Sequence, residues 1–362
     1  MTSRVSQLQN KLQLQNIDAL LVSSAINIIY LTDFAGFSKD EREAFLLITK
    51  NSQYIITDAR YTEAVRKHIL DFTLIEKSSG NSFSDILCRV IKKHTIKTLG
   101  IEEDNLTIAE CKKISSCLNV LKHLNINTLR LTKEKREIEA IAKACNLGDK
   151  AFDYVLKKIT PGVSEKELAF EIEFFIKKHG ADISFPPIVA FGKNSSMPHH
   201  QTNDQRLKTK DIVLLDFGAK LNNYCSDMTR TVFFGKANAK QKRMYKTVLD
   251  AQSKALQSLY DISIYDTQVM AKNVDRVTRE YIVEKGYPTI PHSLGHGIGI
   301  EVHEAPRLSP VSKEMLKEGM VFSIEPGIYL PGFGGVRIED LVVIERNGFR
   351  ILTKSPKNLI EI

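Results

Sequence analysis

The 362-residue sequence lacks any apolar run of about 18 residues, the length that a membrane-spanning helix needs. Residues 1–16 are polar and have no apolar core of the kind found in secretory signals. We therefore expect a cytoplasmic protein with no membrane partner. Hydrophobic residues make up 43% and charged residues 26% of the chain, and this ordinary globular composition excludes a disordered or fibrous protein.

The sequence has few cysteines, and they show no pairing pattern. There are five, an odd number, and no two have the CxxC spacing of a thiolate metal site. A disulfide framework and a thiolate zinc site are therefore not expected. We predict small, mostly buried free thiols with structural roles in a reducing compartment, at Cys88, Cys111, Cys117, Cys145 and Cys225.

Basic residues exceed acidic ones, but they are not gathered in one part of the chain. The net charge is +8, from 51 Lys and Arg against 43 Asp and Glu, and the excess is spread over both residues 1–130 and residues 131–362. A nucleic-acid partner would require basic residues clustered on one face. We therefore expect a mildly basic, solvated surface and no nucleic-acid binding.

Local patterns divide the chain into two domains, 1–130 and 131–362. The first alternates expected strands with expected helices, which is typical of an α/β layer. The second contains two long helix pairs, each followed by a β-rich stretch, and this weak internal repeat suggests a duplicated α+β unit. Expected helices are 5–16, 62–68, 84–94, 133–159, 164–180, 238–260 and 267–285, and expected strands before residue 130 are 19–23, 44–48, 53–57 and 98–101.

Two aspartates interrupt apolar runs in the middle of the second domain. Asp216 follows the run 212–215, and Asp227 precedes the run 229–234. A hairpin whose loop is Leu221 and Asn222 would set the two aspartates directly opposite each other, with Cβ atoms about 5 Å apart on one face. Two carboxylates at that distance in an apolar sheet require a proton or a cation between them.

The C-terminal region repeats this arrangement. Glu325 interrupts the strand expected at 321–330, and Glu339 lies in the strand expected at 335–344. A three-residue turn at 331–333 would place the two glutamates opposite each other. Between the two hairpins, the glycine-containing segment 291–304 holds three of the nine histidines, and the glycines allow backbone to pack closely beside a site. These histidines are His292, His296 and His303.

Together these residues have the composition of a two-metal site. Four carboxylates and one neutral imidazole balance the charge of two divalent cations, and such oxygen-rich sets suit Mn(II), Co(II), Fe(II) or Zn(II). Two adjacent metals can bridge a hydroxide and polarise a carbonyl group. Any one acid alone would more simply be a surface charge or an ion-pair partner, but two acidic hairpins beside a histidine-rich segment favour the metal site.

The motifs LLDFGA, SDMTRT, GHGIGIEVHEAP, SIEPGIY and VRIED resemble those of the pita-bread metallopeptidases, which include methionine aminopeptidases, aminopeptidase P and prolidase. The resemblance implies an α+β chain. Residues 131–362 would form a pita-bread catalytic domain with two pseudo-twofold α+β halves. Residues 1–130 would form a creatinase-type α/β domain, as in the proline-specific branch, that gates the substrate and contributes contacts to a homodimer.

The resemblance also implies roles for individual residues. Asp227 and Glu339 would bridge the metals, and Glu325 would also be the general base. Arg337 would orient Glu339 or the substrate, and His200 would be structural. The full set of implied metal ligands is Asp216, Asp227, His296, Glu325 and Glu339, and the implied substrate or oxyanion contacts are His199, His292 and His303. Mn(II) or Co(II) would be the metals, with Zn(II) or Fe(II) as alternatives.

The expected activity is hydrolysis of the N-terminal Xaa–Pro bond of proline-containing peptides, as an aminopeptidase in preference to a dipeptidase. An Xaa–Pro bond has no amide N–H, so a general protease that needs this donor is excluded. Other readings are a metal-free creatinase-like hydrolase, a non-catalytic binding module and a methionine aminopeptidase. The complete ligand set argues against the first two, and the N-terminal domain and His199 argue against the third. Pro186 and Phe191 depart from the family pattern, which often has a polar or acidic residue near the first position and a small one near the second, so the sequence does not fix the shape of the substrate pocket.

Overall fold

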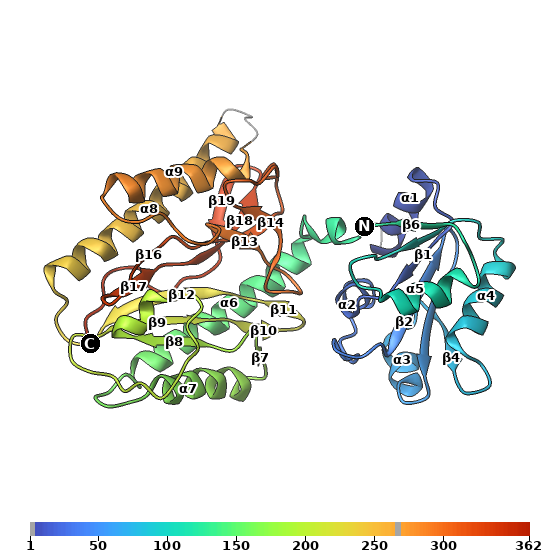
Figure 1. Cartoon of the computed structure of the whole chain (residues 1–362), viewed down its shortest axis with the longest axis horizontal. Coiled ribbons are helices and arrows are strands. Elements are labelled where there is room, and N and C mark those ends of the chain that lie inside the picture. The colour runs from blue at the N-terminus through green and yellow to red at the C-terminus, as the bar shows by residue number, and fades with distance from the viewer. Residues whose placement is uncertain (1–3, 265–268) are drawn as a thin grey trace. The chain divides into compact units, whose positions relative to one another are not determined.

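The computed structural model describes residues 4–264 and 269–362 (Figure 1). The chain separates into two compact units, Met1–Arg130 and Leu131–Ile362. The α+β class expected from the sequence is present, since helices and strands occur in both units. None of the described helices is long and apolar enough to cross a membrane.

The first unit is a six-stranded mixed sheet with helices around it. The strand order is β4-β3-β2-β1-β5-β6, in which β2 runs antiparallel to both of its neighbours and the other pairs are parallel. Its strands are β1 (Ala19–Val22), β2 (Ala44–Thr49), β3 (Gln53–Asp58), β4 (Thr73–Lys77), β5 (Leu99–Ile101) and β6 (Leu121–His123). Its helices are α1 (Arg4–Leu14), α2 (Ala25–Thr32), α3 (Thr62–His68), α4 (Phe83–Lys93), α5 (Ile108–Ser115) and the short η1 (Asn127–Arg130).

The prediction that all five cysteines are free thiols was wrong. Cys88 of α4 forms a disulfide with Cys117, which follows α5, and their Cα atoms are 5.0 Å apart. The two helices pack against each other, so residues 29 positions apart in sequence become neighbours. Spacing along the sequence gives no sign of such a pair, because it depends on how the two helices pack. Cys111, Cys145 and Cys225 are free.

The second unit consists of two halves, each with a long helix pair packed on strands. In the first half, α6 and α7 cover the sheet β12-β9-β8. In the second, α8 and α9 cover the sheet β14-β13-β15-β18-β19 and the ribbon β16-β17. The strands of this unit therefore lie between the two helix pairs (Figure 1). The helices are α6 (Lys135–Leu156), α7 (Glu165–Lys178), α8 (Ala239–Ile264), α9 (Ala271–Glu284) and the short η2 (Gly192–Ser196).

Each half has its own apolar core, which holds the strands rigidly against the helices. Phe152 of α6 and Phe217 of β9 are fully buried in the first core, and Phe322 of β15 is fully buried in the second. Strands of the first half are β7 (Asp182–Ile183), β8 (Ile188–Phe191), β9 (Ile212–Phe217), β10 (Ala219–Leu221), β11 (Tyr224–Cys225) and β12 (Met228–Phe233). Strands of the second are β13 (Gly295–Gly297), β14 (Glu304–Leu308), β15 (Val321–Ile324), β16 (Gly327–Leu330), β17 (Gly334–Arg337), β18 (Asp340–Glu345) and β19 (Gly348–Ile351).

Most of the expected helices and strands are present within a few residues of their expected bounds. The helix expected at 164–180 begins after Ser164, whose hydroxyl accepts from the N–H of Glu167, the expected capping box. It ends before Gly180, which has φ 78°. The helix expected at 267–285 begins later, at Ala271, and its expected first two residues lie outside the described part of the chain.

Candidate metal centre

The first acidic hairpin forms, but its turn lies one residue further along than predicted. Asn222 and Asn223 make the two-residue loop, with φ 49° and 71°. A tight hairpin turn of this kind needs positive φ at both central positions, which asparagine tolerates and leucine does not. Asp216 therefore pairs with Thr229, and the predicted direct pairing of Asp216 with Asp227 is wrong.

The corrected register still keeps both aspartates on one face. A shift of two residues preserves the side of the sheet on which a side chain lies, so Asp227 becomes a diagonal neighbour of Asp216. Between them, the chain passes so close to its partner strand that a Cβ on Gly218 would lie 1.8 Å from the carbonyl oxygen of Ser226. Both carboxylates are buried, with Asp216 8% and Asp227 4% exposed.

The second acidic hairpin has the predicted register. Ile324 pairs with Asp340 on one side of the two glutamates, and Gly327 pairs with Arg337 on the other. Glu325 and Glu339 therefore lie opposite each other in the gap between these ladders.

The histidine-rich segment brings imidazoles to the same place. His296 lies in β13, with its Nε2 3.3 Å from Glu325 Oε1 and 3.7 Å from Asp227 Oδ2. A Cβ on neighbouring Gly295 would lie 1.9 Å from the carbonyl oxygen of Ser323, so glycine is needed where β13 meets β15. The His303 ring centroid is 4.4 Å from that of His296.

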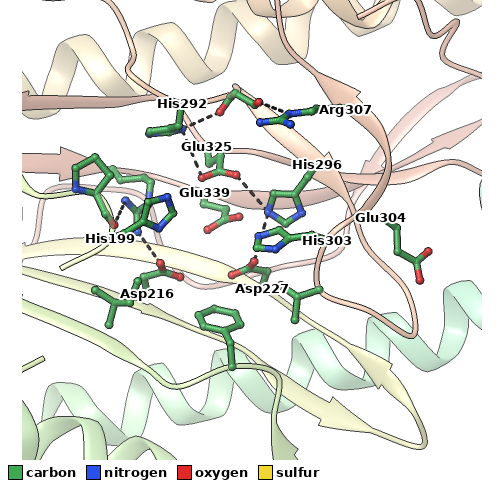
Figure 2. Close-up of a pocket in the computed structure, with 16 residues that line it drawn as sticks. His199, Asp216, Asp227, His292, His296, His303, Glu304, Arg307, Glu325 and Glu339 are labelled. Atoms are coloured by element: carbon green, nitrogen blue, oxygen red, sulfur yellow. Dashed lines mark hydrogen bonds and ion pairs between the residues drawn. The ribbon is translucent and has the colours of Figure 1, made fainter. Parts of the chain in front are cut away.

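These side chains line a cavity of about 560 Å³ (Figure 2). Figure 2 shows the carboxylates of both hairpins and the rings of His296 and His303 converging on one space, while Arg307 lies toward its upper edge. All nine residues predicted for the site are in its lining, which also includes residues that were not predicted. The predicted ones are His199, Asp216, Asp227, His292, His296, His303, Glu325, Arg337 and Glu339, and the others include Phe185, Ile188, Val302, Glu304 and Arg307.

Burial and crowding perturb the acids strongly. Burial, together with the charges of Glu325 and Asp216, raises the pKa of Glu339 to about 8. Burial and the charges of Glu339 and Asp216 raise the pKa of Asp227 well above its ordinary value. Burial acts in the same direction on Glu325, but the hydrogen bond and charge of His296 outweigh it and lower the pKa of Glu325 to about 2.

The donor set fits a divalent cation. Asp227, His296 and Glu339 each offer one ligand atom, and these atoms all lie within 4.8 Å of one another. Asp227 Oδ1 is buried and has no hydrogen-bond partner among the described residues. A buried carboxylate oxygen without a partner is costly, and a cation would satisfy it while relieving the repulsion between the acids.

Comparison with known proteins agrees with this geometry. Residues 139–346 match Metallopeptidase family M24, and residues 4–146 match the Creatinase/Prolidase N-terminal domain. The chain belongs to metallopeptidase family M24. It therefore has the pita-bread fold predicted for its second unit and the creatinase-type domain predicted for its first.

Several relatives of this M24 protein are similar over its whole length. An Xaa-Pro dipeptidase of Pyrococcus furiosus is 37% identical, over 99% of this chain and 100% of that protein. The structure of an Xaa-Pro dipeptidase from Bacillus anthracis is 36% identical with a TM-score of 0.91 and 99% of each chain covered. The structure of an X-Pro aminopeptidase from Thermotoga maritima is also 36% identical, with a TM-score of 0.86, over 97% of this chain and 99% of that one.

A network of hydrogen bonds holds side chains of the M24 site in place. Sequence reasoning missed most of this network. Arg337 Nη2 donates to Asp216 Oδ2 at 2.6 Å, and its Nη1 donates to the hydroxyl of Tyr329 at 2.9 Å. The same hydroxyl lies 2.9 Å from His292 Nε2. Tyr329 follows Glu325 by four residues within the single strand expected at 321–330, so the two-residue period of a strand could have indicated it.

The two consecutive histidines in the first half take different environments. His199 is exposed and lines the cavity, whereas His200 is buried and its Nε2 lies 2.7 Å from Glu165 Oε2. The structural environment predicted for His200 is therefore present.

The sequence left open how Pro186 and Phe191 affect the substrate pocket, and the structure places neither of them in the cavity lining. Pro186 is exposed outside the cavity lining, and Phe191 is buried in the apolar core of the first half. Their neighbours Phe185 and Ile188 line the cavity instead. The direction of each side chain depends on how β8 and the segment before it are seated on the sheet, which the sequence motif does not show.

Proposed function

We propose that this M24 protein is a two-metal exopeptidase that hydrolyses the bond before proline, and that its preferred substrates are Xaa-Pro dipeptides. The cluster of Asp227, His296 and Glu339 inside the cavity supports the metal-dependent part of the proposal. Relatives named Xaa-Pro dipeptidase that align over nearly the full chain support the substrate class.

Five residues would hold the metals: Asp216, Asp227, His296, Glu325 and Glu339. Two divalent cations there would make water acidic enough to attack at neutral pH and would polarise the scissile carbonyl. Glu325, whose Oε1 lies 3.3 Å from His296 Nε2 in the cavity lining, would be the base that accepts the proton of the attacking water.

The histidines of the cavity would help to stabilise the negative charge that develops on the oxygen of the scissile carbonyl. Burial lowers the pKa of both His292 and His303, so each imidazole is neutral at neutral pH and carries one N–H. In His292 the Nδ1 lies 2.7 Å from the carbonyl oxygen of Ser293, which can only accept, so its N–H is already used and His303 is the imidazole that can donate to the substrate. Directed at the oxygen of the scissile carbonyl, such a donor stabilises the charge that develops there. The hydroxyl of Tyr329 hydrogen-bonds to His292 Nε2 at 2.9 Å and so holds the orientation of that ring. The apolar side chains of Phe185, Ile188 and Val302 offer contact surface to a pyrrolidine ring.

Arg307 supports a preference for dipeptides. It is a cationic, exposed residue in the cavity lining, and its Nε donates to Ser293 Oγ at 2.7 Å. A dipeptide carries its free carboxylate directly on the proline, so a guanidinium at this edge of the cavity would select short substrates. A guanidinium group can bind a carboxylate through two parallel hydrogen bonds.

The test compares Ala-Pro, Ala-Pro-amide and Ala-Pro-Ala, with Ala-Ala-Ala as the control, on chelator-treated enzyme with and without added Mn(II). We expect metal-dependent cleavage of Ala-Pro, and a kcat/KM about 10- to 100-fold lower for the amide, as expected for losing a charged hydrogen bond. Arg307→Met should lower kcat/KM for Ala-Pro by the same factor and leave the amide unchanged. Arg350→Met, a surface control whose side chain is 49% exposed, should change neither.

The second candidate is an Xaa-Pro aminopeptidase, which the sequence alone favoured and which the likeness to the X-Pro aminopeptidase of Thermotoga maritima supports. Cleavage of Ala-Pro-Ala as efficient as that of Ala-Pro would establish it in place of the dipeptidase. No cleavage of any proline peptide by metal-loaded enzyme would overturn both.

Three finer properties are part of the same proposal. We expect Mn(II) or Co(II) as the native metals, before Zn(II) or Fe(II), which metal analysis of protein purified without added metal would test. We expect a homodimer, with the first unit contributing contacts and substrate gating, which light scattering would test. We expect a cytoplasmic location, supported by the three free cysteines and opposed by the Cys88–Cys117 disulfide. Cell fractionation would test it.

A further inference from the structure

Thr229 is a buried residue of the second unit, and the mechanism proposed above gives this residue no role. It lies in β12 opposite Asp216 and is completely buried. Its hydroxyl oxygen lies between two side chains of the site. Arg337 Nε donates to Thr229 Oγ1 at 2.9 Å, and Thr229 Oγ1 donates to Glu339 Oε2 at 2.8 Å.

The direction of the hydroxyl proton follows from its two partners. A guanidinium only donates hydrogen bonds, so the Thr229 oxygen must act as the acceptor toward Arg337. The single hydroxyl proton is then available for Glu339 Oε2. Since Arg337 also donates to Asp216 Oδ2 at 2.6 Å, one chain of hydrogen bonds runs from Asp216 through Arg337 and Thr229 to Glu339.

The backbone around Thr229 holds the same glutamate. The N–H of Glu339 donates to the carbonyl oxygen of Thr229 at 3.1 Å. Arg230, the next residue, donates to the carbonyl oxygen of Glu339. Glu339 is therefore attached to β12 at its N–H, its carbonyl and its carboxylate, although it belongs to the other half of the unit.

We propose that Thr229 is a positioning residue for the metal centre, whose hydroxyl sets the rotation of the Glu339 carboxylate before metal binds. The carboxylate cannot turn about its terminal bond without losing the Thr229 hydrogen bond. Threonine is well suited to this task because its branched Cβ restricts χ1. This inference rests on the metal site of the proposed function. Losing a residue that orients a metal ligand typically weakens metal binding about 10- to 100-fold.

The same strand provides a matched control. Thr231 is also buried, 1% exposed, but its hydroxyl bonds the backbone of Arg337, donating to the carbonyl oxygen at 2.9 Å and accepting from the N–H at 3.2 Å. Thr231→Val therefore deletes an equally buried and equally bonded hydroxyl without removing a bond to a ligand carboxylate. Its effect measures what such a deletion does to the fold alone.

The experiment titrates Mn(II) alone into chelator-stripped wild type, Thr229→Val, Thr229→Ser and Thr231→Val, and measures free Mn(II) by its electron paramagnetic resonance signal. We expect Thr229→Val to bind at least one of the two ions about 10- to 100-fold more weakly, and the other two variants to stay within about threefold of wild type. Thr229→Ala deletes the same hydroxyl and serves if the valine variant does not fold, as judged by circular dichroism.

The outcomes separate this inference from the proposed function. Wild-type affinity in the variants that lack the Thr229 hydroxyl would overturn it. An equal loss of Mn(II) affinity in Thr231→Val would also overturn it, because the effect would then come from the fold. An equal loss of Mn(II) affinity in Thr229→Ser would overturn it as well, because the hydroxyl would then not be responsible. A wild-type chain that binds no Mn(II) would overturn the proposed function and this inference together.

Discussion

Replacing Glu339 by glutamine removes one of the four carboxylates of the site while nearly preserving the size of the side chain. Burial and the neighbouring acids raise the pKa of Glu339 from 4.5 to about 8 in the folded, metal-free chain. Between these two values the folded chain binds more protons than the unfolded chain does. The free energy of unfolding therefore falls as the pH rises through this window.

The size of the effect follows from the shift. A displacement of about 3.5 pKa units corresponds to a cost on the order of 4 to 5 kcal/mol once Glu339 is fully ionised. The cost is already close to 1 kcal/mol at about pH 5, where the unfolded glutamate is partly ionised. Relative to wild type, Glu339→Gln should therefore gain on the order of 4 kcal/mol of stability between about pH 5 and about pH 9.

The measurement is calorimetric unfolding of chelator-stripped protein across this pH range. The transition of the catalytic unit is the one that moves when Mn(II) is added to wild type, because a ligand that binds the folded state stabilises it. The charge of Glu339 also raises the pKa of His296 and of Asp227, so the difference between the two proteins reports Glu339 together with its effect on these two neighbours. Glu345→Gln is the control, since Glu345 is on β18 with a side chain that is 48% exposed.

A difference in the free energy of unfolding between Glu339→Gln and wild type that does not change with pH would contradict this prediction. The four carboxylates would then not be crowded in the metal-free protein. Added Mn(II) should abolish the loss of wild-type stability at high pH and leave Glu339→Gln almost unchanged, because the variant lacks one of the carboxylates proposed to hold the metals.

Three further predictions concern other parts of the molecule. Asp227→Asn should abolish binding of at least one metal and lower kcat by more than about 100-fold without unfolding the chain, as checked by metal analysis and circular dichroism; retained turnover would contradict the two-metal mechanism. Tyr329→Phe removes the hydroxyl that contacts His292 and Arg337, and should lower kcat about 10-fold with metal affinity unchanged, whereas an unchanged kcat would show that His292 needs no such support. Replacing Cys88 and Cys117 by serine opens a loop of 29 residues and should lower the free energy of unfolding of the first unit by about 3 to 4 kcal/mol, with kcat unchanged; equal stability in denaturant would contradict the pairing.

Elements of regular pattern were predictable from local sequence. The amphipathic helices α4 and α7 have clear periodicity, and α7 has a capping box, so their positions follow from nearest-neighbour chemistry. The register of the second hairpin was predictable because Pro331-Gly332-Phe333 marks its turn clearly. The first register was misplaced because three successive residues could form the turn, and only the requirement for two positive φ angles selects Asn222 and Asn223.

Local sequence indicates the candidate ligand types and the strand faces on which they lie, because a strand alternates sides with a period of two whatever its partners are. That is enough to identify paired carboxylates, a neighbouring imidazole and a metallopeptidase motif set. How the two halves meet, and which side chains support the candidate ligands, depends on tertiary packing. The bonds that join Thr229 and Arg337 to Glu339 and Asp216 connect residues 108 to 121 positions apart. The disulfide likewise joins two helices with no local pairing signal. Such contacts depend on the packing of whole layers, and no local periodicity encodes them.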